Sequence, residues 1–136
     1  MKELSHLMTD DRWQKLLERG KVLSHNLSRA VFGDDAVAEP IGDLTWQLWS
    51  DLMKQPPRAP DSLLADAFYI VCKMTGNRVS VVRMKAYTKM IFGRPLRVIP
   101  RSKTTKQKWP VGDKAKDIIL SHIPDDDAYE DMVKEW

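Results

Sequence analysis

Residues 63–72 read Leu-Leu-Ala-Asp-Ala-Phe-Tyr-Ile-Val-Cys, and this stretch decides the fold class. Nine of its ten side chains are apolar, and Gly76 follows shortly afterwards. A helix that is apolar nearly all round belongs at the centre of a bundle, where other elements cover every side. Periodicity alone does not exclude a buried strand, but the alanines and the length favour a helix over 62–75 with Asp61 as its N-cap.

Apolar residues at spacings of three and four predict further helices on both sides of this stretch. Side-chain oxygens of Thr9 or Asp10, Ser80 and Asp125 are placed to cap three of them. Gly20 indicates a bend or a close helix contact within the first. Residues 33–42, which contain two glycines and a proline, are expected to form a loop. The expected helices cover about 10–32, 43–54, 80–92, 113–122 and a turn or two after 125.

The helical signal disappears between about 94 and 112, where three prolines interrupt the chain. Residues 96–99 are typical of a short extended piece, and 102–108 of a polar, basic loop or arm. The sequence therefore predicts a mainly α, compact, single-domain bundle of four to six helices with an irregular basic arm or short extended segment. We expect this domain to occupy 1–124, followed by an acidic C-terminal tail or short helix over 125–136.

Length and composition limit the class of protein. The chain has 136 residues, of which 43% are apolar and 30% charged, values typical of one soluble globular domain. No apolar run reaches the roughly 18–20 residues of a membrane span, and the first residues lack the apolar core of a signal peptide. Cys72 stands alone, which favours a reducing compartment. We therefore expect a cytoplasmic protein that does not contact a membrane.

The formal net charge of +3 conceals a strong division along the chain. Residues 1–72 carry a net −3, and residues 117–136 carry a net −6. Between them, residues 73–116 hold thirteen bases and one acid, Asp113, for a net +12. Two explanations are open: a solvated face whose bases pair with acids brought close by folding, or a surface for a polyanion.

This basic block favours a protein that binds nucleic acid through residues 78–108 and does not catalyse a reaction. Such a protein would be a small regulator or a subunit of a nucleoprotein complex. Lysines and arginines separated by hydroxyl residues suit contacts with the phosphates of DNA or RNA. Trp109 is either a base-stacking side chain or a packing anchor beside Pro110. The candidate nucleic-acid-binding residues are Arg78, Arg83, Lys85, Lys89, Arg94, Arg97, Arg101, Lys103, Lys106, Lys108 and Trp109.

The third and fourth helices have the length and the short connection of a helix-turn-helix unit. If Gly76 occupies the turn, Cys72 and Val82 lie at positions where this unit has small or branched apolar residues. Asn77 and Lys85 do not match, because they lie at positions where the unit also has apolar residues. An ordinary helical hairpin is the alternative. In the first case the fourth helix enters the major groove, where its bases reach phosphates or guanine edges.

The acidic tail and the tryptophans suggest protein contacts. The aspartates at 125–127 either fold back on the basic block, dock a basic partner or keep the terminus soluble. Trp46 and Trp49 lie on overlapping faces of the second helix, and an exposed aromatic face there is typical of a partner-binding or homodimer surface. A tryptophan-rich core is the other explanation. The alternative function is thus a protein-interaction module, an inhibitor or an adaptor.

Signals for an enzyme are weak. The three histidines are scattered, and no His-x-x-His or Cys-x-x-Cys pair offers a metal site. The single cysteine lies within the apolar run, where a thiol is usually inert. No glycine-rich phosphate loop is present. We therefore expect no catalytic activity, no metal and no cofactor.

Overall fold

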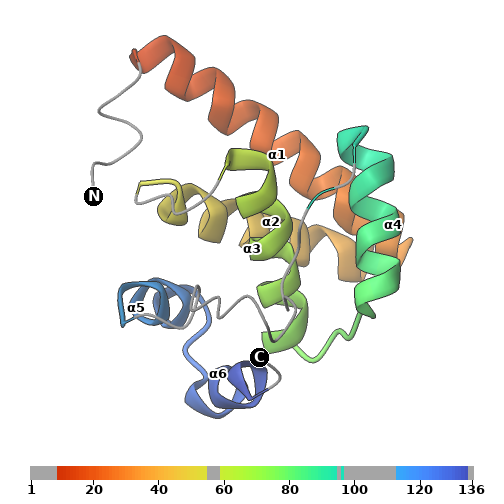
Figure 1. Ribbon diagram of the computed structural model, residues 1–136, viewed down its shortest axis with the longest axis vertical. Helices are drawn as coiled ribbons and strands as arrows, with labels where there is room; N and C mark the ends of the chain where they lie inside the picture. Colours follow the sequence, from red (N-terminus) through yellow and green to blue (C-terminus); the bar gives the residue numbers. More distant parts are fainter. Residues whose placement is uncertain (1–8, 55–58, 95, 97–112, 135–136) are drawn as a thin grey trace.

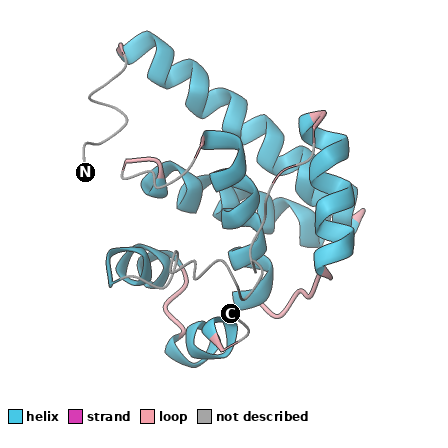
Figure 2. Ribbon diagram, viewed as in Figure 1, coloured by secondary structure: helices cyan, strands magenta, loops and turns pink. Residues whose placement is uncertain are grey.

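The computed structural model describes residues 9–54, 59–94, 96 and 113–134. These ranges contain six α-helices and no β-strand (Figure 2), so the prediction of a mainly α bundle of four to six helices is confirmed. The helices are α1 (Asp10–Phe32), α2 (Asp35–Leu52), α3 (Pro60–Met74), α4 (Val81–Phe92), α5 (Asp113–His122) and α6 (Asp126–Val133).

Helix α3 forms the centre of the bundle. Each residue from 63 to 72 is at most 2% exposed, and α1, α2, α4 and α6 all pack against this helix. Figure 1 shows α3 with α4 on one side and α6 at its lower end. The prediction that Asp61 caps α3 is wrong: the N-cap is Ala59, and Pro60 occupies the first helical position, where a missing N–H costs no hydrogen bond.

Helices α1 and α2 pack as an antiparallel pair. Ser28 donates a hydrogen bond to the carbonyl of Ala38, and Trp46 Nε1 donates to the carbonyl of Leu17, so the contact runs in opposite directions along the two helices. Gly20 lies directly beneath the ring of Trp49, where even a Cβ atom would overlap the indole. The expected close helix contact at this glycine is confirmed.

Helix α2 begins earlier than predicted. The expected loop over 33–42 is wrong, because Asp34 caps a helix that already starts at Asp35 and continues through Pro40. In a sequence, proline and glycine usually indicate a loop, but Pro40 and Gly42 lie at positions where a helix accommodates them. Pro40 is exposed, and Gly42 lets α2 approach His25, whose Nδ1 would lie 2.9 Å from a Cβ atom at 42. Packing against α1 therefore overrides the local signals.

The remaining helices begin and end where the sequence predicts. Thr9, Ser80 and Asp125 each accept a hydrogen bond from a backbone N–H three residues later, at the starts of α1, α4 and α6. Gly93 ends α4 with φ of 76°, a left-handed conformation that favours glycine. Helix α5 packs on α2, and α6 packs on α3 through the buried side chains of Tyr129 and Met132. The C-terminal acidic segment is therefore a helix that forms part of the same core.

The predicted basic arm lies almost wholly outside the described residues. Of the segment 94–112, the structure describes Arg94 and Leu96, and Leu96 is 7% exposed and belongs to the hydrophobic core. Within the described ranges, no helix combines the length and the apolar composition that crossing a membrane requires.

Gly20→Ala tests the contact between α1 and α2. Overlap with Trp49 should cost about 1–3 kcal/mol and outweigh the roughly 1 kcal/mol that alanine contributes as a better helix former. Because the overlap seen here is severe, we expect the free energy of unfolding, measured by circular dichroism in urea, to fall by up to about 2 kcal/mol.

The matched control is the same substitution in a Trp49→Phe background. The smaller ring leaves room for a methyl group, so Gly20→Ala should then be neutral or stabilising. If Gly20→Ala stabilises the protein with Trp49 in place, the glycine does not hold this close contact in solution.

Candidate nucleic-acid interface

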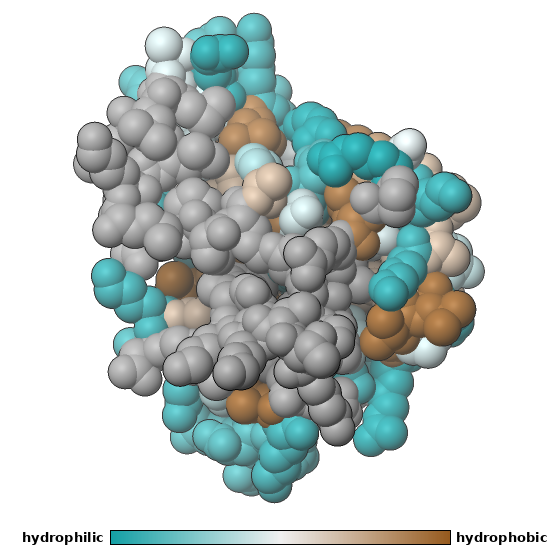
Figure 3. All heavy atoms as spheres, viewed as in Figure 1, coloured by the Kyte–Doolittle hydropathy of each residue, from teal (hydrophilic) through white to brown (hydrophobic). Residues whose placement is uncertain are grey.

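Helix α4 has one packed face and one exposed face. Met84 and Thr88 are buried on the inner face, where α4 contacts α1 and α3. On the outer face Val82 is 79% exposed and Met90 is 60% exposed. In Figure 3, apolar and strongly polar side chains lie side by side over α4, at the right of the view. We call this outer face the α4 ridge; its members are the exposed residues Val82, Lys85, Ala86, Lys89 and Met90.

The two lysines of the ridge have no acidic partner within the described residues. Lys85 and Lys89 are exposed, and neither forms an ion pair with another residue of the described ranges. Helix α4 also contains no acidic residue. Arg78, in the connection before α4, is likewise exposed and without an ion pair in that part of the chain. These three bases are therefore among the charges of the block that have no acidic partner within the described residues.

Two other predicted binding residues have structural contacts. Arg83 donates a hydrogen bond to the carbonyl of Val31 on α1 and lies over the ring of Tyr87, 5.7 Å from its centre. Arg94 donates to the Asp61 carboxylate at 3.0 Å. Both guanidinium groups thus help to fix the bundle, and their charge is partly satisfied within the protein.

Asp61 connects three parts of the chain through ion pairs that the sequence did not predict. Its carboxylate, 14% exposed, also accepts a hydrogen bond from Arg19 of α1 at 2.7 Å. This hydrogen bond is the main reason that the pKa of Arg19 is raised. The carboxylate therefore joins α1, the start of α3 and the residue after Gly93. No local pattern could predict this, because its two partners lie 42 and 33 residues away.

The helix-turn-helix register is wrong. Helices α3 and α4 are joined by residues 75–80, which is longer than the three or four residues of the usual turn. In that register Val82 would be buried between the helices, but it is among the most exposed apolar side chains of the described residues. Helix α4 packs more extensively on α1 than on α3. The alternative of an ordinary helical connection fits this arrangement.

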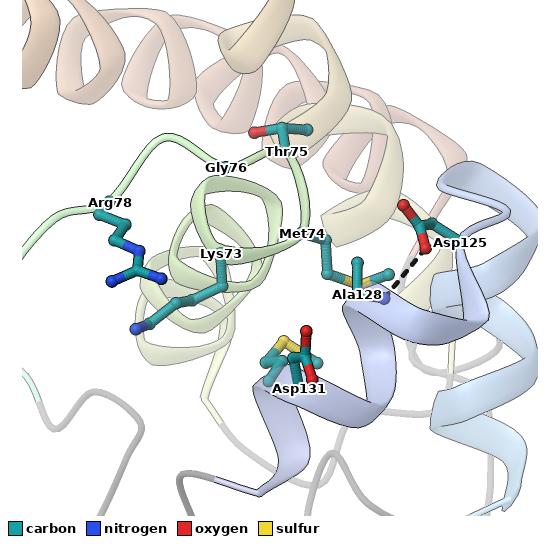
Figure 4. A pocket seen from close by; sticks show the side chains of 9 residues that line it. Lys73, Met74, Thr75, Gly76, Arg78, Asp125, Ala128 and Asp131 are labelled. Carbon is teal, nitrogen blue, oxygen red and sulfur yellow. Dashed lines mark hydrogen bonds between the residues drawn. The ribbon is translucent and has the colours of Figure 1, made fainter.

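The acidic helix α6 lies next to part of the basic block. Lys116 of α5 and Glu130 of α6 form an ion pair at 3.7 Å. A polar hollow of about 420 Å³ also lies between α6 and the end of α3 (Figure 4), with Arg78 on its rim. Folding therefore brings some tail acids toward the block, but toward its edges at Arg78 and Lys116 and not to the α4 ridge. The residues that line the hollow are Lys73, Met74, Thr75, Gly76, Arg78, Asp125, Ala128, Asp131 and Met132.

The predicted exposed tryptophan face is wrong. Trp49 is 1% exposed, and its Nε1 donates to the carbonyl of Pro60, so it is a core residue that joins α2 to the start of α3. Trp46 is half-buried, and Lys21 lies over its ring at 5.1 Å. Helix α2 packs on α1, α3 and α5, and a helix with three neighbours buries aromatic side chains on more than one face. The alternative of a partner-binding module thereby loses its anchor at Trp49.

The structure does not place the other predicted binding residues. They lie in the segment 97–112, outside the described residues, and remain sequence-based predictions. They are Arg97, Arg101, Lys103, Lys106, Lys108 and Trp109.

The two histidines of the described chain are each paired with an aspartate. His25 contacts Asp43 at 2.9 Å, and His122 contacts Asp51, each pair joining two helices. In the part of the chain that is described, no three His, Cys, Asp or Glu side chains are grouped as metal ligands. Burial raises the pKa of the Cys72 thiol well above its ordinary value, because the thiolate would lose its hydration.

Comparisons of the chain with protein-family models, with curated proteins and with solved structures found no match.

Cys72 should be unreactive in the folded protein. It is 1% exposed, and its raised pKa leaves almost no thiolate near neutral pH, so a disulfide reagent such as DTNB should react very slowly. When the protein is unfolded in guanidinium, DTNB should react at the rate of an ordinary thiol and release one equivalent of its coloured thiolate product. Rapid reaction without denaturant would show that α3 is not closed on every side.

Proposed function

We propose that this protein is a non-catalytic nucleic-acid-binding protein that acts as a small regulator or as a subunit of a nucleoprotein complex in the cytoplasm. Its affinity comes mainly from phosphate contacts made by the basic residues of 78–108. The observation that carries the proposal is the α4 ridge, where Lys85 and Lys89 are exposed and uncompensated within the described residues.

The charge distribution supports a polyanionic partner. If the block were only a solvated face neutralised by folding, acids of the flanking segments would lie against its bases. In the described part of the block, this holds for Arg94, which pairs with Asp61, and for Lys116, which pairs with Glu130. The exposed bases Arg78, Lys85 and Lys89 form no such pair within the described residues. Exposed lysines concentrate counterions, and a nucleic acid that replaces these counterions gains affinity from their release. An acid-free helix at the surface provides the continuous positive potential that this binding needs.

Fluorescence anisotropy with labelled single- and double-stranded oligonucleotides, between about 50 and 200 mM salt, tests the proposal. Affinity should fall steeply with salt concentration. Lys85→Ala with Lys89→Ala should reduce the slope of log K against log salt by about 0.9 for each lysine on duplex DNA, or about 0.7 on a single strand.

The matched control is Lys15→Ala with Lys134→Ala. These two lysines are 75% and 77% exposed, each pairs with an acid on its own helix, and their loss changes the net charge by the same amount. The control should leave the slope nearly unchanged. Absence of binding to every oligonucleotide at low salt would contradict the proposal, as would equal effects of the two variants.

The predicted arm is tested separately with Arg97→Ala, Arg101→Ala, Lys103→Ala and Lys106→Ala combined. The four positions are basic residues of the block by sequence. If they contact phosphates, the slope should decrease by up to about 0.9 per residue while the circular dichroism spectrum stays unchanged. An unchanged slope would exclude these four residues from the phosphate contacts and leave only the bases of 78–94 and Lys108 as candidates.

A further inference from the structure

We propose that the α4 ridge enters the major groove of double-stranded DNA and contacts base edges there. This inference rests on the proposed function and specifies the nucleic acid and the element that meets it. It comes from a feature that phosphate binding does not require: the ridge carries a line of exposed apolar side chains alongside its lysines. Phosphate contacts alone would be served by bases and hydroxyls.

The apolar members of the ridge lie in one line. Val82, Ala86 and Met90 are spaced four residues apart, so they follow one another along the same side of the helix. Val82 and Met90 are two of the three large apolar side chains of the described chain that are strongly exposed. Lys85 and Lys89 form a second line beside it, each three residues after an apolar member of the ridge. The two adjacent lines place apolar contacts and cations within reach of the same surface.

This composition matches what the major groove presents. Thymine offers its C5-methyl group to apolar side chains, and guanine offers the O6 and N7 acceptors to a lysine. The groove is about 12 Å wide, enough for one α-helix with its side chains. The twelve residues of α4 give a length of about 18 Å, and the helix packs on the bundle along one side only. Residues at the start of α4 would then reach base edges, while Arg78 contacts the adjacent backbone.

A protein partner fits the ridge less well. Protein interfaces have a contiguous apolar core from which charged residues are depleted, and lysine is among the residues depleted most. On the ridge, the lysines run directly alongside a single line of apolar side chains, so this face offers no broad apolar core that is depleted of charge. The ridge is better matched by a negatively charged surface that also offers an apolar contact at each helical turn. The major groove of duplex DNA, with its phosphates and thymine methyl groups, is such a surface.

The first experiment compares wild-type protein on duplex DNA and on duplex RNA of the same sequence and length, by fluorescence anisotropy at equal salt. The two duplexes carry the same number of phosphates, but the major groove of A-form RNA is too deep and narrow for a helix. We expect DNA to bind about tenfold tighter or more. Equal affinity for the two duplexes, or a preference for single strands, would overturn the groove inference and leave the proposed function standing. No binding to any of them would contradict the proposed function itself.

The second experiment uses Val82→Glu, with Val22→Glu as its control. Both valines are strongly exposed, at 79% and 58%, and both substitutions add one negative charge, but Val22 lies on α1, outside the ridge. A glutamate in the first turn of α4 favours the helix, so circular dichroism should show both variants folded. We expect Val82→Glu to weaken duplex DNA binding about tenfold or more and Val22→Glu only about twofold. Equal losses would assign the effect to net charge and overturn the role of the ridge.

Discussion

The ten consecutive residues of α3 that are at most 2% exposed impose the main constraint on this fold. An all-round apolar helix must be covered on every side, and the other helices are arranged to do so: α1 and α2 as an antiparallel pair, α4 along one side and α6 at the C-terminal end. A covering helix contributes one face to the core and leaves its opposite face in water. The exposed face of α4 is therefore a direct consequence of the burial of α3.

What that exposed face carries decides the functional proposal. Lys85 and Lys89 stay hydrated at little cost, and exposed Val82 and Met90 add apolar side chains to the same face. The acids of α6 lie against the edges of the basic block, at Lys116 and near Arg78, and leave the centre of α4 uncompensated. A positive, partly apolar ridge on a rigid helix is the arrangement that a nucleic-acid groove would complement.

Helix bounds were largely predictable because local chemistry fixes them. Thr9, Ser80 and Asp125 each supply a side-chain acceptor to the first turn of a helix, and this interaction spans three residues. The errors arose where distant contacts override local ones. Pro40 and Gly42 indicated a loop, but the packing of α2 on α1 extends the helix through both. Exposed bases at 85 and 89 could be predicted from helical periodicity, but the neutralisation of Arg94 by Asp61 could not, since the pair is separated by 33 residues.

Composition and short-range periodicity belong to the chain alone, and they predict the helical class, the central place of residues 63–72 and the concentration of positive charge between 73 and 116. Which side chains remain available at the surface depends instead on how the helices pack. This packing buried Trp49 over Gly20, joined Asp61 to two arginines and left Val82 in solvent. The physical reason is that exposure depends on which faces meet when helices pack, and that depends on contacts between residues far apart in the chain.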